Sequence, residues 1–287
     1  MRALVTGGGG QLASDLATLL GDDADVFGRE ELDITDCDGL DRVFAKVKPD
    51  VVFNCAAFHN VDVCETEPER SWQVNVEAIR QLAVRSPVLV HVSTNYVFDG
   101  TGTEPYAEED LPSPRSVYAL TKLAGEYAAL GYCERALVVR TGGLYGLHGS
   151  VSKGGNFVQR MIARARQQGS LRMVADQRLQ PTFTADLAEA IVAGADAGAT
   201  GIVHLTASGE CSWHEFTVAI MARAGLDAPV EPVPTVRPPG GVFRPLNGVL
   251  SRPRADSLGL PVLRHWEDGL TDYMERAGLA AAASLTD

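Results

Sequence analysis

Short apolar runs alternate with helical stretches through the first half of the chain, and this alternation constrains the possible folds most strongly. The runs predicted as strands are Arg2–Thr6, Ala24–Gly28, Asp50–Cys55, Val88–Ser93 and Ala136–Thr141. Helical periodicity lies between them, at Gln11–Leu20, Asp36–Lys48, Glu69–Arg85 and Ser116–Leu130. Several runs are apolar on both faces, which is typical of a parallel sheet covered by helices on each side. We therefore predict an α/β fold with a doubly wound parallel sheet and a ligand crevice at the carboxyl ends of its strands.

The second half of the chain alternates less regularly. Helices are predicted at Phe157–Gln168, Ala185–Ala193 and Trp266–Arg276, and strands at Leu171–Val174 and Ile202–Thr206. Gly142–Asn156 is rich in Gly and Ser, which predicts a loop over the crevice. Pro229–Pro253 holds seven prolines in 25 residues, and we expect no regular structure there because proline lacks an amide proton.

Charge and composition exclude several classes of function. The 25 Lys and Arg against 37 Asp and Glu give a net charge of −12 without any basic run. We therefore expect neither nucleic acid nor an anionic membrane surface as a partner. No apolar run approaches the roughly 18 residues of a membrane span, and the N-terminus does not resemble a signal peptide. The five cysteines include no CxxC pair and the six histidines no HxH or HExxH pair, which favours a cytoplasmic protein with reduced thiols and no metal site.

The segment Thr6–Ala13, with four consecutive glycines, connects the first predicted strand to the first predicted helix. It fits the dinucleotide-binding pattern as Gly-x-x-Gly-x-x-Ala or as Gly-x-Gly-x-x-Ala, and both share Gly10 and Ala13. Positions without side chains let the backbone approach a pyrophosphate, and the helix amino terminus supplies free amides. The alternative is a flexible turn. In a doubly wound sheet of the Rossmann type, this loop predicts cofactor contacts from Gly7, Gly10, Gln11 and Leu12.

The end of the second predicted strand indicates which dinucleotide binds. An NAD-binding fold usually has a carboxylate about 20 residues after the glycine loop, where it holds the ribose. This corner instead has Gly28, which removes a carboxylate that would repel a 2′-phosphate, and Arg29, which supplies a cation. The pattern favours NADP. NAD is the alternative if Arg29 is only solvated and Glu30, Glu31 or Asp33 holds the ribose.

Tyr118 and Lys122 lie near the start of a predicted helix and share one face of it. The ammonium can lower the pKa of the phenol and prepare Tyr118 to protonate a carbonyl oxygen as a hydride arrives. Ser93 and Thr94 end the fourth predicted strand, where a hydroxyl can donate a second hydrogen bond to that oxygen. The Tyr-x-x-x-Lys spacing alone is common on helix surfaces, but with the glycine loop and this strand end it indicates dinucleotide-dependent carbonyl reduction.

Nearly the whole chain resembles the extended short-chain dehydrogenases, and among them the dTDP-4-dehydrorhamnose reductase family. The segments that carry the resemblance are the glycine loop, Leu32–Asp36, Pro49–Glu65, Val74–Asn75, Ser93–Gly102, Tyr118–Glu126, Val139–Gly146, Gly154–Val158 and Asp176–Ala188. The VFDG and DQxxxPT motifs within them are far more specific than Tyr-x-x-x-Lys. The resemblance implies NADPH-dependent reduction of the 4-keto group of a dTDP-linked 6-deoxyhexose.

The resemblance also implies roles for individual residues and regions. Thr94, Tyr118 and Lys122 form the catalytic triad, and Tyr118 and Lys122 also contact the cofactor. Further cofactor contacts are implied for Arg29, Asp33, Ile34, Ala56 and Ala57. Substrate contacts are implied for Asn95, Tyr96, Asn156, Gln177, Thr182 and Arg244. We expect residues 1–142 and about 184–206 to form an NADP-binding Rossmann domain, and about 143–183 and 207–287 a smaller C-terminal substrate-binding α/β domain.

Two departures from the family pattern leave the sugar open. Asn95 stands where the family usually has Asp, and Gly142-Gly143 replaces a Ser and an aromatic residue. A neutral amide cannot hold a sugar hydroxyl as a carboxylate would, and a pocket without the aromatic wall would be wider. The product could therefore belong to a sister deoxysugar pathway.

Three other functions share parts of this pattern. A nucleotide-sugar epimerase would use the same cofactor loop and Tyr118/Lys122 pair. A 4,6-dehydratase would too, but Asn95-Tyr96 lacks the acid–base pair that dehydration requires. A non-catalytic NADP-binding regulatory subunit is a further alternative, against which the intact triad counts. The sequence leaves the oligomeric state open, with a homodimer as one option.

Overall fold

Six parallel strands form the central sheet in the computed structural model, which describes residues 1–148, 155–237 and 240–281. Across the sheet they are β10 (Gly201–His204), β5 (Ala136–Thr141), β4 (Leu89–Thr94), β3 (Val51–Asn54), β1 (Ala3–Thr6) and β2 (Ala24–Phe27). After β2 the chain crosses to the other side of β1, so the strand order reverses between β1 and β3. In a doubly wound sheet this reversal opens a ligand crevice at the carboxyl ends of the strands. The predicted fold class is confirmed.

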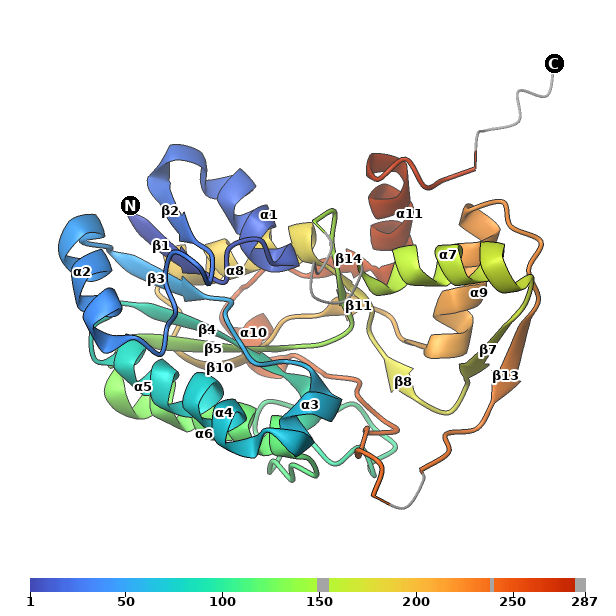
Figure 1. Cartoon of the computed structure of the whole chain (residues 1–287), viewed down its shortest axis with the longest axis horizontal. Helices are drawn as coiled ribbons and strands as arrows, with labels where there is room; N and C mark the ends of the chain where they lie inside the picture. Colours follow the sequence, from blue (N-terminus) through green and yellow to red (C-terminus); the bar gives the residue numbers. More distant parts are fainter. Residues whose placement is uncertain (149–154, 238–239, 282–287) are drawn as a thin grey trace.

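Helices cover both faces of the sheet (Figure 1). On one face α1 (Gln11–Leu20) packs against α8 (Thr184–Asp196). On the other lie α2 (Cys37–Val47), α5 (Ala78–Ala83) and α6 (Val117–Tyr132). None of the described helices combines the length and the apolar character needed to cross a bilayer.

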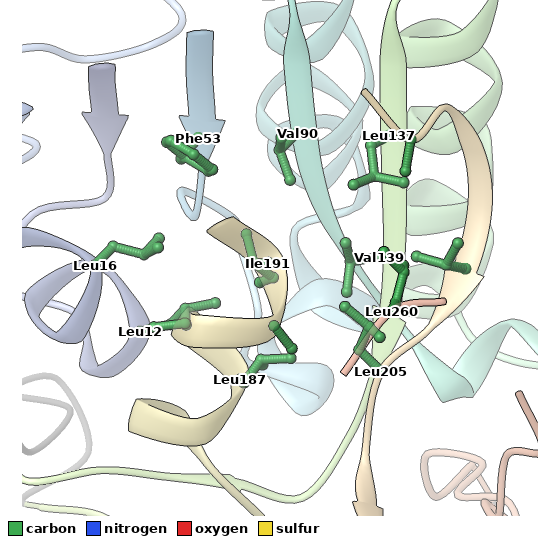
Figure 2. Packing of buried hydrophobic residues seen from close by; sticks show 14 of the residues in the cluster. Leu12, Leu16, Phe53, Val90, Leu137, Val139, Leu187, Ile191, Leu205 and Leu260 are labelled. Carbon is green, nitrogen blue, oxygen red and sulfur yellow. The ribbon is translucent and has the colours of Figure 1, made fainter. Parts of the chain in front are cut away.

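The core under α1 and α8 fixes the position of the glycine loop (Figure 2). Leu12 and Leu16 of α1 share one buried cluster with Leu187 and Ile191 of α8 and with Val139 of β5. Burying an aliphatic side chain of this size stabilises the fold by about 1.5–3 kcal/mol. Because α1 begins where the glycine loop ends, this packing holds the loop at the carboxyl end of β1.

One predicted helix is interrupted in the structure. After α3 (Val61–Thr66), the stretch expected as one helix from Glu69 to Arg85 consists of α4 (Pro68–Trp72), a π-helical turn (Gln73–Glu77) and α5. The Asn75 carbonyl in the π turn lies close against α6, where a Cβ on Gly125 would come within 2.2 Å of it. Such π turns often lie at functional sites.

Most of the remaining elements form a smaller α/β part, at the right in Figure 1. Its helices include α7 (Phe157–Gln168), α9 (Trp213–Arg223) and α11 (Trp266–Arg276). Its strands pair as β7 (Leu171–Val174) with β13 (Val230–Val233), β6 (Leu144–Tyr145) with β9 (Thr182–Phe183), β8 (Arg178–Leu179) with β12 (Cys211–Ser212), and β11 (Ala207–Ser208) with β14 (Leu263–His265). Its core is aromatic, with Tyr145 in contact with Phe183 at 5.8 Å and Tyr273 at 5.2 Å between ring centroids. A short helix, α10 (Pro253–Ser257), contacts β10 of the main sheet.

The proline-rich region differs from its prediction, because β13 lies within it. Pro232 is tolerated there because its nitrogen points away from β7. The carbonyls of Pro229 and Val233 accept hydrogen bonds from the amides of Leu171, at the start of β7, and Ala175, just after its end. Proline is compatible with such an edge position. The predicted loop after Thr141 also contains a short strand, β6, and residues 149–154 of that loop lie outside the described residues.

Candidate active site

A cavity of about 410 Å³ opens at the carboxyl ends of β1, β3, β4 and β5, where the sheet meets the smaller part. The start of α1, the end of β4 and the first turns of α6 form one side of it. Predicted site residues that line it are Gly10, Gln11, Leu12, Ala57, Thr94, Asn95, Tyr96, Tyr118, Lys122, Asn156 and Gln177. The structure therefore brings together residues that the sequence places in separate motifs.

The glycine loop is pressed against neighbouring strand ends. Gly7 has a φ of +79°, and a Cβ on it would lie 2.8 Å from the Ala56 nitrogen. A Cβ on Gly8 would lie 2.8 Å from the Gly28 nitrogen. Gly10 caps α1 in extended conformation, so the amino end of α1 faces the cavity. This arrangement fits a dinucleotide pyrophosphate, which free helix amides bind.

The corner after β2 combines a small residue, a cation and carboxylates. A Cβ on Gly28 would meet no described atom closer than 3.5 Å, so crowding does not require glycine there. The Glu31 carboxylate accepts the Gly28 amide hydrogen at 2.9 Å. The Asp33 carboxylate accepts hydrogen bonds from both the backbone amide and the hydroxyl of Thr35. The same carboxylate lies 3.5 Å from Arg29 Nε. The Arg29 side chain is 68% exposed and can turn toward a 2′-phosphate.

Tyr118 faces the end of β4 from the first turn of α6. Ser116 caps this helix by accepting a hydrogen bond from the Ala119 amide. The Tyr118 hydroxyl lies beside Thr94, and its ring meets Tyr96 edge-on at 5.9 Å between centroids. Burial raises the pKa of Tyr118 to about 12, although the Thr94 hydroxyl opposes this. The expected lowering of this pKa is therefore wrong, because burial outweighs the stabilisation of the phenolate.

Lys122 lies one turn further along α6 and is 2% exposed. Its Nζ donates to the Val92 carbonyl at 2.7 Å and lies 3.3 Å from His91 Nε2. Burial lowers the pKa of Lys122 to about 8, while the Glu126 carboxylate opposes the shift. The lysine is therefore charged at neutral pH, although its pKa lies close to that pH.

The two hydroxyls that end β4 have different partners. Ser93 Oγ donates to Glu126 Oε1 at 2.5 Å, and Glu126 of α6 forms an ion pair with Arg140 of β5. Thr94 lies beside Tyr118 and accepts the Tyr96 amide at 3.2 Å. Thr94, rather than Ser93, is therefore the hydroxyl available to a carbonyl oxygen.

The two departures from the family pattern form one packing arrangement. Asn95 Nδ2 donates to the Gly248 carbonyl at 2.8 Å. A Cβ on Gly142 would lie 2.7 Å from Asn95 Oδ1, so the amide occupies space that Gly142 leaves. Asn95 therefore offsets the expected widening at Gly142 but not at Gly143, which replaces the aromatic residue and has Gln180, Pro181 and Leu179 as neighbours.

The amides predicted to face the substrate already have partners inside the protein. Asn156 Nδ2 donates to the Gly146 carbonyl and to Tyr273 Oη, both at 2.7 Å, while its oxygen caps α7. Gln177 Nε2 donates to Thr235 Oγ1 at 3.0 Å. Both residues therefore shape the cavity wall and link the segments around it.

Several predicted site residues lie outside the cavity lining of the described chain: Gly7, Arg29, Asp33, Ile34, Ala56, Thr182 and Arg244. Ile34 packs in the core under α2. Thr182 is fully buried, donating to the Gln180 carbonyl and accepting the Ala207 amide. Arg244 lines a second cavity of about 320 Å³ and pairs with Asp62 at 2.8 Å. The side chains of Ile34 and Thr182 are therefore committed to the fold.

The smaller part contributes residues that the sequence did not reveal. Phe157 and Trp213 have ring centroids 4.5 Å apart, and both line the two cavities. Arg160 of α7 adds a cation to the main cavity. The signal for α9 was the capping box formed by Ser212 and Glu215, which places Trp213 in the first turn.

Asn75 is another residue whose role the sequence did not reveal. Its side chain accepts the Phe58 amide at 2.9 Å and donates to the Phe58 carbonyl at 3.0 Å. It also donates to Thr121 Oγ1 at 3.1 Å, next to Lys122. Asn75 thus joins the loop after β3 to the helix that carries Tyr118 and Lys122.

The Rossmann sheet, the glycine loop and the Thr94–Tyr118–Lys122 set together define a short-chain dehydrogenase of the extended type. The chain belongs to the family described as RmlD substrate binding domain, which matches residues 1–278. It is 39% identical to the dTDP-4-keto-6-deoxy-D-glucose reductase of Streptomyces niveus, over 94% of this chain and 95% of that protein. It is also 39% identical to the dTDP-4-dehydrorhamnose reductase of Streptomyces griseus, over 94% and 92%. The dTDP-4-dehydrorhamnose reductase of Bacillus anthracis str. Ames, solved in complex with NADP, matches with a TM-score of 0.90 and 31% identity, over 96% of this chain and 98% of that one.

Proposed function

We propose that this chain reduces the 4-keto group of a dTDP-linked 6-deoxyhexose with NADPH. The observation that carries the proposal is the placement of Thr94, Tyr118 and Lys122 beside the glycine loop in one cavity. Membership of a family whose relatives are named as dTDP-sugar reductases supports the substrate class.

The side chains of the cavity supply the proton side of this reaction, and the cofactor, when bound, supplies a hydride to the carbonyl carbon. Tyr118, protonated because burial keeps its pKa high, gives its phenolic proton to the carbonyl oxygen. The C=O bond becomes CH–OH and the phenol becomes a phenolate. Thr94 donates a hydrogen bond to the same oxygen as charge develops on it. The Lys122 ammonium stabilises the phenolate, returns a proton to it and recovers one from solvent.

The two cavities suggest how the substrate is divided between the parts of the molecule. The main cavity holds the keto sugar beside Tyr118, and the second cavity takes the nucleotide half. Phe157, Gln177 and Trp213 line both cavities, so the two spaces adjoin. In this proposal residues 1–142 and about 184–206 bind the cofactor, and the rest of the chain binds the nucleotide sugar.

The preference for NADPH is testable at Gly28. The space around Gly28 admits a side chain, so we expect Gly28→Asp to fold and to shift the preference toward NADH, because a carboxylate repels the 2′-phosphate. The measurement is kcat/KM with each cofactor, and Glu31→Gln serves as a control that leaves NADPH use intact. A wild-type protein with higher kcat/KM for NADH would show that the corner was misinterpreted.

The activity itself is tested by following NADPH oxidation with a panel of dTDP-, UDP- and GDP-linked 4-keto-6-deoxysugars. We expect turnover with the dTDP sugars. The neutral amide of Asn95 and the missing aromatic wall at Gly143 predict that more than one of them is accepted. Interconversion of sugars without net loss of NADPH would instead indicate an epimerase. NADPH binding without oxidation by any sugar would indicate a regulatory subunit.

A further inference from the structure

A chain of buried hydrogen bonds connects the strand before the glycine loop to Lys122. Thr6 Oγ1 donates to Asn54 Oδ1 at 2.6 Å, Asn54 Nδ2 lies 2.9 Å from His91 Nδ1, and His91 Nε2 lies 3.3 Å from Lys122 Nζ. The four side chains come from β1, β3, β4 and α6, and none is more than 2% exposed. Among the described residues that line the cavity, His91 does not appear. The His91 side chain therefore lies behind the cavity wall and contacts Lys122, which is part of that wall.

The partners of Asn54 determine which nitrogen of His91 carries the proton. The Ala56 carbonyl can only accept and lies 3.4 Å from the amide nitrogen of Asn54, so this nitrogen faces His91 Nδ1 and the amide oxygen faces the Thr6 hydroxyl. An amide nitrogen can only donate, so Nδ1 accepts and the neutral ring carries its hydrogen on Nε2. That N–H is directed at Lys122 Nζ. An amine has a lone pair to accept it, whereas an ammonium has none.

The other groups around Lys122 favour its protonated form, whereas the Nε2–H of His91 favours the neutral amine. The Val92 carbonyl accepts from Nζ, and the Glu126 carboxylate raises the pKa of Lys122 by Coulombic interaction. Tyr118, one turn earlier on α6, gains from a nearby positive charge when it is ionised. Burial lowers the pKa of His91 far below its ordinary value, so this ring stays neutral.

We propose that His91 is a positioning residue for Lys122, which it holds by donating from Nε2 to the amine form, and that the Thr6–Asn54–His91 chain reverses when Lys122 binds a proton. In the reversed chain the ammonium donates to Nε2, Nδ1–H donates to the amide oxygen of Asn54, and the amide nitrogen donates to Thr6. The reversal turns the Asn54 amide over and gives up its 3.4 Å contact with the Ala56 carbonyl, so the chain is better satisfied when Lys122 is an amine. The benefit to turnover rests on the proposed function: a lysine that releases its proton readily can return one to the Tyr118 phenolate, breaking an N–H bond and forming an O–H bond.

The direct test is independent of any substrate. Long-range ¹H–¹⁵N spectra of the full-length protein, labelled at histidine and with NADP⁺ bound, report which ring nitrogen of His91 is protonated. We expect the hydrogen on Nε2 at high pH and on Nδ1 at low pH, with the exchange following the titration of Lys122. The signal is assigned by its loss in His91→Asn. A tautomer that does not change between about pH 6 and pH 10 would overturn the proposal.

A second test uses the pH profile of the reductase. Reduction requires the Lys122 ammonium, so kcat should fall as pH rises through the pKa of Lys122. Asparagine is too short to reach Nζ, so His91→Asn releases both forms of Lys122 from the ring. Because only the ammonium form costs the Asn54–Ala56 contact, we expect the fall to move to higher pH by up to about one unit. Gln at the same position extends further and should restore the contact, with its amide oxygen toward the ammonium, so His91→Gln should move the fall to higher pH as well.

The matched control is His204, a second buried histidine two strands away, whose Nδ1 contacts the Ser251 carbonyl at 2.8 Å. His204→Asn should leave the pH profile in place. A lower kcat with an unmoved profile in both His91 variants would show that His91 only packs. If no keto sugar is reduced at all, the proposed function fails, while the tautomer measurement still decides the role of His91.

Discussion

Burial acts on Tyr118 and Lys122 in opposite directions, and both effects suit a reduction. It raises the pKa of Tyr118 to about 12 and lowers the pKa of Lys122 to about 8, because in each case it disfavours the charged form. The phenol therefore stays protonated until the carbonyl oxygen takes its proton. The lysine is charged at neutral pH yet close enough to its titration to give a proton back.

The role of Tyr118 predicts a specific loss on removal of one oxygen atom. Tyr118→Phe keeps the ring and its contact with Tyr96 but removes the proton donor. General acid catalysis contributes about 10²–10⁴-fold, so kcat should fall by that order, while the Kd for NADPH, measured by fluorescence titration, stays nearly unchanged. Thr94→Val should lose less, because it removes one hydrogen bond and leaves the proton source. Near wild-type turnover by a folded Tyr118→Phe protein would place the acid elsewhere.

Among the elements, α6 carries both catalytic groups and is anchored by a buried ion pair. Glu126 lies one turn after Lys122, and its carboxylate is 2.7 Å from Arg140 Nη2 on β5, with both side chains almost fully buried. It also accepts from Ser93 of β4. The pair therefore fixes α6 against the two strands whose ends form the cavity.

Loss of the cation should destabilise the whole fold. Arg140→Met leaves the Glu126 carboxylate buried without its partner, and breaking a buried pair in this way costs about 3–5 kcal/mol. Urea denaturation should show this decrease in the free energy of unfolding. The double variant Glu126→Gln/Arg140→Met should recover most of it, because no buried charge remains. A double variant no more stable than Arg140→Met would show that packing of Arg140 over Phe98, rather than charge, is what matters.

Elements formed by local pattern were predictable, and those that depend on distant contacts were not. The run Ala136–Thr141 is matched residue for residue by β5, because burial on both faces leaves a continuous apolar signal. The glycine loop and the Tyr118/Lys122 pair were visible for the same reason, since their spacing within one element carries the information. By contrast, Pro232 lies in a strand only because β7 pairs with it. The partner of Asn95 is Gly248, 153 residues away, and no local pattern announces such a contact.

At the scale of the whole molecule, the ion pair between Asp62 and Arg244 joins the two parts beside the second cavity. Asp62 belongs to α3 beside the sheet, and Arg244 belongs to the segment after β13. Their side chains are 64% and 39% exposed, and exposed pairs contribute only about 0–1 kcal/mol to stability. If Arg244 binds the diphosphate of the substrate, the Asp62 carboxylate competes with the phosphates for the same guanidinium.

This competition predicts opposite effects of the two partners on substrate binding. Arg244→Met removes charge-assisted hydrogen bonds of about 1.5–3 kcal/mol, so the KM for the nucleotide sugar should rise roughly 10–100-fold at similar kcat. Asp62→Asn keeps the size of the side chain and releases the guanidinium, so KM should stay the same or fall. The free energy of unfolding of both variants should lie within about 1 kcal/mol of the wild-type value, because the pair is exposed. An equal rise of KM in both variants would mean that Arg244 acts only through its ion pair with Asp62, because either substitution breaks that pair.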